Sequence, residues 1–205
     1  MQTNHKIKAV IFDMGGVFLR SGDATTRLRL ASQLGTSLEE VYREVFNSES
    51  ARKASVGEIT EEQHWLDVAE HFHLLPSEME NFQDLFWAGD LYDLTLINFI
   101  RSLRPKRKTG LLSNAWSGAR NMLTQFYPCL DAFDASIFSA EVHVAKPDAR
   151  IYEMILSRLD VKPAESIFVD DFIENIDAAN QLGIHGIHFR SPEQARKDIM
   201  NLLGE

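Results

Sequence analysis

Four short apolar segments constrain the fold of this chain more than any other feature. They cover residues 8–12, 109–112, 135–138 and 166–169, and a weaker fifth covers 186–189. Continuous apolar runs of this length are typical of strands buried on both faces, as in parallel sheets. Helical patterns separate most of them. The sequence therefore predicts an α/β fold, with a Rossmann-like parallel sheet covered by helices on both faces.

The interval between the first two predicted strands is too long for a simple crossover and contains helices of its own. Three segments within it have the Ser/Thr-x-x-Glu/Gln pattern of a helix capping box: Ser37–Glu40, Thr60–Gln63 and Ser77–Glu80. We predict an inserted helical bundle over about residues 22–88, followed by a helix over 93–103 that returns the chain to the sheet. Residues 1–21 and 89–205 then form the α/β core.

The composition of the chain indicates which kinds of partner it can bind and in which cellular compartment it works. The formal net charge of -9 disfavours nucleic acid, because an acidic surface repels a phosphate backbone. No apolar run approaches the length of a membrane span, and the polar N-terminus does not read as a signal peptide. The single cysteine, Cys129, permits no disulfide within the chain and fits a reducing compartment. We expect a cytoplasmic protein, either a monomer or a homodimer, without nucleic-acid or membrane partners.

Polar side chains follow three of the predicted strands at the point where each strand ends. Asp13 follows the first strand, Ser113 and Asn114 follow the second, and Asp170 and Asp171 end the fourth. In a parallel sheet, ligands bind beyond the carboxyl ends of the strands. We therefore expect these residues to collect at one edge of the sheet.

Each of these segments also has a purely structural interpretation. A carboxylate at the position of Asp13 costs desolvation unless it is paired, yet an aspartate can also simply cap a turn. Ser113 and Asn114 precede a helix predicted from about Ala115, whose free N–H groups favour an anion. Either residue could equally be only the cap of that helix.

The same two interpretations apply to the lysine and to the acid pair. Lys146, fixed by Pro147, can act as a point charge for phosphate, or it can be a surface lysine before a helix. Asp170 and Asp171 are close enough to disfavour joint ionisation without a cation, and oxygen ligands suit Mg²⁺. Two acids at the start of a helix would also be stabilised by the helix dipole alone.

Taken together and in this order, the four segments resemble the motifs of the haloacid dehalogenase superfamily of hydrolases, in the subfamily with an α-helical cap. The resemblance spans nearly the whole chain, and the helical insertion is similar to the family's cap. The Asp170-Asp171-x-x-x-Asn175 pattern and the Gly57-Glu-Ile-Thr60 turn are similar to one subgroup. That subgroup holds sugar-phosphate phosphatases and the N-terminal domain of soluble epoxide hydrolase.

The resemblance implies a Mg²⁺-dependent phosphohydrolase in which Asp13 attacks phosphorus and forms an aspartyl-phosphate that water hydrolyses. The implied substrate is a small phosphorylated metabolite, such as a sugar-phosphate-like monoester. The implied site residues are Asp13, the Gly15 carbonyl, Asp171 and, nearby, Asp170 for the metal, with Ser113, Asn114 and Lys146 for phosphate and charge.

Gly15 departs from the family pattern, because most phosphatases of the family have an aspartate there as general acid and base. Glu58 and His143 are candidates to supply the missing proton, although ordinary surface roles suit both residues. Two alternatives stay open at this point. One is a 2-haloacid dehalogenase, which would use Asp13 on carbon without a metal. The other is a catalytically impaired binding module.

Overall fold

A central parallel sheet organises the computed structural model, which describes residues 6–205. Its strand order is β5-β4-β1-β6-β7, and every neighbouring pair is parallel. The strands are β1 (Ala9–Phe12), β4 (Lys108–Ser113), β5 (Ala135–Phe138), β6 (Ser166–Asp170) and β7 (His185–His188). The predicted α/β class is confirmed, and each predicted apolar segment forms a strand. Because β1 lies at the centre, the residue that follows it has a strand end on either side.

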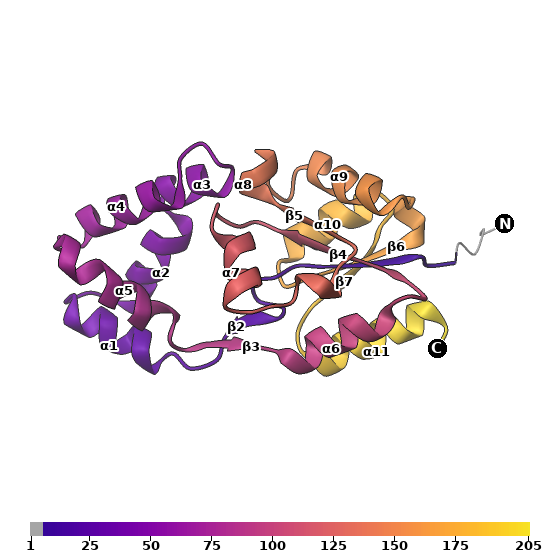
Figure 1. The fold of residues 1–205 in the computed structure, drawn as a ribbon, viewed down its shortest axis with the longest axis horizontal. Coiled ribbons are helices and arrows are strands. Elements are labelled where there is room, and N and C mark those ends of the chain that lie inside the picture. The colour runs from indigo at the N-terminus through magenta and orange to yellow at the C-terminus, as the bar shows by residue number, and fades with distance from the viewer. Residues whose placement is uncertain (1–5) are drawn as a thin grey trace.

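Helices cover both faces of the sheet (Figure 1). Successive side chains of a strand point to opposite faces, so Val10 and Phe12 pack in one apolar cluster while Ala9 and Ile11 pack in another. The first cluster is completed mainly by α6, α7 and α11, and the second by α9 and α10. The bounds are α6 (Leu94–Leu103), α7 (Ala119–Gln125), α8 (Ser139–Val142), α9 (Ala149–Leu159), α10 (Ile173–Gln181) and α11 (Pro192–Leu203). Burial on both faces explains why the strands are continuously apolar.

Five helices form a separate bundle beside the sheet (Figure 1). They are α1 (Thr25–Gln33), α2 (Leu38–Asn47), α3 (Glu49–Ser55), α4 (Glu61–His71) and α5 (Met79–Trp87). The bundle has its own apolar cluster, which includes Val41, Val45 and Phe86. Two short antiparallel strands, β2 (Leu19–Ser21) and β3 (Asp90–Tyr92), bracket it. The division at about residues 22 and 88 stays a prediction, and this two-stranded ribbon lies close to both predicted boundaries.

Two of the three helix caps predicted within the bundle are confirmed, and the third is not. Thr60 and Gln63 form a full reciprocal capping box, and Ser37 accepts a hydrogen bond from the Glu40 N–H. The third prediction was wrong, because Ser77 lies inside a 3₁₀ turn over Pro76–Glu78 and caps nothing. Pro76 starts that turn early, and Glu78 itself accepts the Leu75 N–H at 2.8 Å. Helix α5 then begins at Met79.

A second correction concerns the helix predicted from Ala115. Helix α7 starts only at Ala119, after a loop whose amides bond elsewhere. The Ala115 N–H donates to Ser139 Oγ at 2.9 Å, and the Gly118 N–H donates to Glu61 Oε2 at 2.9 Å. These long-range bonds fix the loop before the helix begins. The expected helix N-terminus is therefore not available to an anion there.

None of the helices in the described part of the chain is both long enough and apolar enough to cross a membrane.

Candidate active site

Asp13 stands at the end of the central strand with only 6% of its surface exposed. Its backbone N–H donates to the Val169 carbonyl at 2.9 Å, which extends the pairing of β1 with β6 by one residue. Strand β4 lies on its other side and brings the buried Ser113 to the same edge. The polar residues at the ends of β1 and β4 therefore lie at the same edge of the sheet, as predicted.

Two consecutive glycines turn the chain beyond Asp13, and they differ in what they require. Gly16 has a left-handed φ of 68°, and a Cβ there would lie 2.0 Å from Asp171 Oδ2. Only glycine fits at that position. A Cβ at Gly15 would meet no atom within 4 Å. Hence Gly16 lets the Asp171 carboxylate lie against the turn, whereas the space next to Gly15 is open.

Lys146 is buried between two carboxylates. Its Nζ lies 2.8 Å from Asp13 Oδ1 and donates to Asp170 Oδ2 at 2.6 Å. Asn114 holds the lysine backbone from both sides, since its Nδ2 donates to Lys146 O at 2.9 Å and its Oδ1 accepts Lys146 N–H at 2.8 Å. The Asn114 side chain therefore positions Lys146 in this structure, a contact that the sequence did not predict.

Asp170 is held by more donors than the other two acids. The Phe172 N–H donates to its Oδ1 at 2.8 Å, and Asn175 Nδ2 lies 3.0 and 3.1 Å from its two oxygens. With Lys146 on Oδ2, both oxygens are engaged. Asp170 thus fits a role in holding Lys146. Asn175 belongs to the site as the residue that orients Asp170, and its place in the Asp-Asp-x-x-x-Asn pattern was the available signal.

Asp13 and Asp171 are held less completely than Asp170. Among the residues that the structure describes, Asp171 Oδ1 is buried without a hydrogen-bond partner, and Asp13 Oδ1 has only the ion pair with Lys146 Nζ at 2.8 Å. One oxygen each from Asp13, Asp170 and Asp171 lie within 4.8 Å of one another. Buried carboxylate oxygens without partners are costly unless a cation is bound. The donor set, hard oxygens only, fits Mg²⁺.

Comparison with known families identifies the chain. Residues 7–183 match the model of the haloacid dehalogenase-like hydrolases. The chain belongs to this family. The predicted membership of the haloacid dehalogenase-like hydrolases is thereby confirmed.

Curated relatives and solved structures of similar length are found in fungi and bacteria. The chain is 28% identical to Sesquiterpene phosphatase astK of Aspergillus oryzae over 96% of its own length and 97% of the relative. It is 24% identical to D-ribitol-5-phosphate phosphatase of Bacteroides thetaiotaomicron, over 96% and 98%. A family enzyme of Bacteroides thetaiotaomicron, solved in complex with magnesium and inorganic phosphate, has a TM-score of 0.75 at 20% identity, covering 90% of this chain and 94% of that one.

Burial controls the protonation of the hydrolase site. Desolvation raises the pKa of Asp13 to about 7, against the lowering effect of Lys146. Desolvation also raises the pKa of Asp171, with repulsion from Asp170 as the second cause. The pKa of Lys146 is raised: desolvation favours its neutral form, but Asp13 and Asp170 together outweigh it. The lysine is therefore a fixed positive charge, and three clustered acids that share this single lysine favour binding of a second cation.

The two candidate proton donors lie at the contact between the bundle and the sheet. His143 is exposed, and its Nδ1 bonds to the Val56 carbonyl at 2.9 Å. Glu58 is exposed, in the turn that follows α3. Neither residue is among the groups that bond to Asp13, Lys146 or Asp170. Their role as proton donors stays a prediction.

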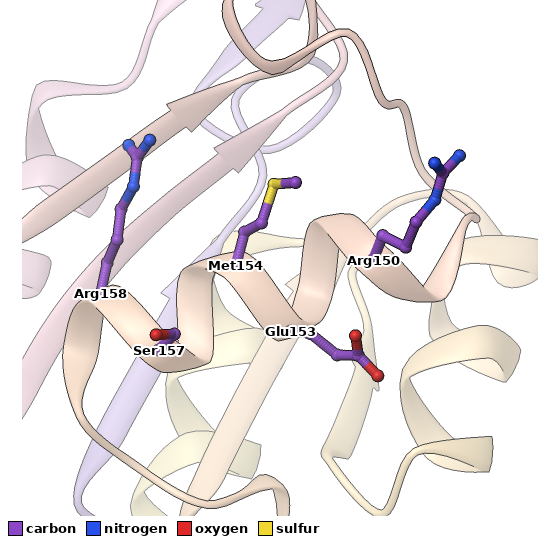
Figure 2. Close-up of a pocket in the computed structure, with 5 residues that line it drawn as sticks. All are labelled: Arg150, Glu153, Met154, Ser157 and Arg158. Atoms are coloured by element: carbon purple, nitrogen blue, oxygen red, sulfur yellow. The ribbon is translucent and has the colours of Figure 1, made fainter.

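A surface hollow along α9 offers no comparable chemistry. It is lined by Arg150, Glu153, Met154, Ser157 and Arg158. Figure 2 shows that all five come from this one helix and that their side chains spread apart. One of them, Arg150, pairs with Asp148 at 2.8 Å. With no converging ligands, the hollow is not a second candidate site.

Proposed function

We propose that this chain is a Mg²⁺-dependent phosphohydrolase acting on a phosphomonoester of a small metabolite, through an aspartyl-phosphate intermediate. The observation that carries the proposal is the buried cluster of Asp13, Asp170 and Asp171, in which a single lysine pairs with Asp13 and Asp170 and Asp171 Oδ1 is left without a partner. This arrangement suits a nucleophile that works next to a cation. Phosphatases among the relatives support the reaction class. The single cysteine is consistent with action in the cytoplasm.

The proposed reaction has two displacement steps. A carboxylate oxygen of Asp13 forms a bond to phosphorus while the ester P–O bond breaks, and the alcohol leaves with a proton. Water then attacks the phosphorus of the aspartyl-phosphate, releasing inorganic phosphate and restoring the carboxylate. Ser113 and the Asn114 backbone N–H hold phosphate oxygens, and Lys146 offsets negative charge on Asp13 and phosphate.

The metal would be held by Asp13, Asp171 and the Gly15 carbonyl, with Asp170 adjacent. Bound there, Mg²⁺ supplies charge neutralisation between the nucleophile and the phosphate. Asp170 keeps Lys146 in place through the 2.6 Å contact and is itself oriented by Asn175. A dehalogenase is less well supported, because three clustered carboxylates would repel a carboxylate substrate.

The leaving alcohol must obtain its proton without an acid at Gly15. General acid catalysis is worth about 10²- to 10⁴-fold, so esters with good leaving groups should react fastest. The space around Gly15 would admit an aspartate, since a Cβ meets nothing within 4 Å. Gly15→Asp should therefore flatten the dependence of rate on leaving-group pKa.

The alcohol part of the substrate is a separate question. The sequence resemblance favours a sugar phosphate. Among the relatives, one is a ribitol-5-phosphate phosphatase and another a sesquiterpene phosphatase, which differ greatly in polarity. The proposal at this level is a small phosphorylated metabolite, with a sugar phosphate as the alcohol favoured by sequence alone.

The decisive experiment compares Asp13→Asn with wild type. The amide keeps the shape of the side chain but cannot act as the nucleophile, so phosphate release from p-nitrophenyl phosphate should fall to background. Beryllium fluoride should bind only the wild type, in the presence of Mg²⁺. Asp177→Asn, an exposed acid on α10, is the matched control and should be unaffected. Full activity of Asp13→Asn, or wild-type activity unchanged by EDTA, would refute the mechanism.

A further inference from the structure

Three aromatic rings form a continuous surface between the helical bundle and the sheet, which we call the aromatic wall: Phe46, Trp87 and Trp116. The Phe46 and Trp116 rings are stacked with centroids 6.1 Å apart, and Trp87 lies 5.9 Å from Phe46 and 6.5 Å from Trp116. Phe46 is 42% exposed and Trp87 36%. Scattered exposed apolar residues are ordinary, but a contiguous patch of large rings marks a surface that binds something.

The wall includes a residue from the loop that also carries a proposed phosphate-site residue. Trp116 comes two residues after Asn114, in the loop that leaves β4, and its indole Nε1–H donates to the Ala51 carbonyl of α3 at 3.3 Å. On the other side of Asp13, Phe172 directly follows Asp171 and is 60% exposed. Since β1 lies between β4 and β6, Asp13 has exposed or half-buried aromatic side chains following both neighbouring strands.

Two buried polar side chains next to the wall, Arg27 and His64, are already engaged within the protein. Arg27 lies over the Trp87 ring at 6.0 Å, yet it is 1% exposed and donates to Phe86 O at 2.6 Å and Tyr42 Oη at 2.9 Å. Its remaining nitrogen pairs with Asp90 at 2.5 Å. A polyol placed against the wall would lose hydrogen bonds to water and find this cation occupied.

His64, whose ring lies 4.6 Å from that of Trp116, is engaged in the same way. Its Nδ1 contacts Ser50 Oγ at 2.8 Å, and its Nε2 contacts the Val45 carbonyl at 3.0 Å. The side chain is fully buried. The wall therefore presents ring surface, which gains free energy by covering apolar groups.

We infer that the wall receives the alcohol part of the substrate and selects an apolar or aromatic alcohol over a polyol. The inference rests on the proposed phosphohydrolase function and narrows its substrate class, away from the sugar phosphate that sequence alone favours. Phe46 is the specificity-determining residue to test, because it is the most exposed ring of the wall and none of the site carboxylates contacts it.

The test uses phenyl phosphates with 4-methyl, 4-ethyl, 4-propyl and 4-butyl substituents, whose leaving-group pKa values are nearly equal. Any trend in kcat/KM then reports contact with the alcohol and not leaving-group chemistry. For the wild type, kcat/KM should rise about two- to fourfold per methylene, as expected for partial to full burial. The 4-(4-hydroxybutyl) ester should be poorer than the butyl ester.

Phe46→Ala should flatten this series while leaving inhibition by inorganic phosphate unchanged, which shows that the phosphate site is intact. Phe46→Leu keeps an apolar contact and should be intermediate, and it serves if the alanine variant does not fold. Phe126→Ala is the control, since Phe126 is 73% exposed at the end of α7, away from the wall. It should match the wild type.

A flat or falling wild-type series, or a hydroxybutyl ester that equals the butyl ester, would overturn the inference and leave the phosphohydrolase function standing. An unchanged slope in both Phe46 variants would also overturn it. Absence of phosphate release from every ester, p-nitrophenyl phosphate included, would instead refute the proposed function and the inference with it.

Discussion

At the scale of single residues, the charged side chains of the site differ in how many hydrogen-bond and ion-pair partners each has. Lys146 pairs with both Asp13 and Asp170, whereas Asp171 keeps a buried oxygen without a hydrogen bond. Breaking a buried charge network by removing one member typically costs about 3–5 kcal/mol. Three acids thus share one lysine at this place, where a cation can balance the remaining charge.

The two glycines after Asp13 should respond oppositely to alanine. Gly16→Ala combines a left-handed φ with a Cβ 2.0 Å from Asp171 Oδ2, so it should lower the free energy of unfolding by about 2 kcal/mol or more and abolish activity. Gly15→Ala meets no atom and should change stability by less than about 1 kcal/mol. Urea denaturation of the two variants measures this difference. Equal losses would mean that both positions need glycine for the backbone.

The raised pKa of Asp13 predicts how stability depends on pH in the absence of metal. The folded pKa of about 7 exceeds the ordinary aspartate pKa of 3.8, so between these pH values the folded protein holds a proton that the unfolded chain releases. Stability due to this group is present below about pH 4 and is lost as pH rises toward 7. With EDTA, the urea midpoint of wild type should fall between pH 5 and 7.5 relative to Asp13→Asn. Parallel pH curves would contradict this.

At the scale of elements, the end of α3 docks on α8. Ser139 Oγ donates to the Ser55 carbonyl, and His143 Nδ1 bonds to the Val56 carbonyl at 2.9 Å. Gly57 packs against this contact with a φ of 69°, and a Cβ there would lie 2.4 Å from the Ala140 carbonyl oxygen. The helical bundle thus meets the sheet through backbone atoms as well as through the aromatic wall.

Gly57→Ala should therefore impair turnover beyond its effect on stability. The added carbon forces the two backbones apart, and a displacement of about 1 Å can cost about 100-fold in rate. Gly35 has a similar φ of 65° but no atom within 4 Å of an added Cβ, so Gly35→Ala carries the same backbone strain without the contact. We expect a lower melting temperature for Gly57→Ala and, at a temperature where both variants are fully folded, a kcat/KM at least about tenfold lower. Equal kcat/KM values would argue against a functional docking contact.

At the scale of the whole molecule, three clusters of buried apolar side chains stabilise the fold. Two lie on the faces of the sheet and the third lies within the helical bundle. Trp116 comes from the sheet side of the chain but packs against the third cluster, so it joins the two parts. Ligands that bind at the edge of the sheet should consequently stabilise the whole chain.

Metal binding should raise the melting temperature as a linkage effect. At about 100 times its dissociation constant, Mg²⁺ contributes about 2.7 kcal/mol, which for a chain of this size is about 5–10 °C. Asp171→Ala removes an unpartnered oxygen and should abolish the shift, whereas Asp177→Ala should retain it. Differential scanning calorimetry with Mg²⁺ and with EDTA measures both. A full shift in Asp171→Ala would exclude this residue as a ligand.

The local patterns of the sequence determined the elements and the edge of the sheet. Five apolar segments predicted five strands, and the Thr60–Gln63 pattern predicted the start of α4. Such signals depend on residues within about one helical turn or on strand alternation, and can be seen in any short window. Where Pro76 shifted a turn by a few residues, the same local rule failed.

Only the tertiary structure decided which groups meet. Lys146 reaches Asp13 because α9 and the loop after β4 pack on neighbouring strands, and the Asn114 side chain turned out to hold that lysine. Likewise, φ and a neighbouring carboxylate distinguish Gly16 from Gly15, and Trp116 enters the aromatic wall through contacts with distant helices. These contacts join residues far apart in the chain. Their geometry is set by packing across layers, which no local pattern of residues records.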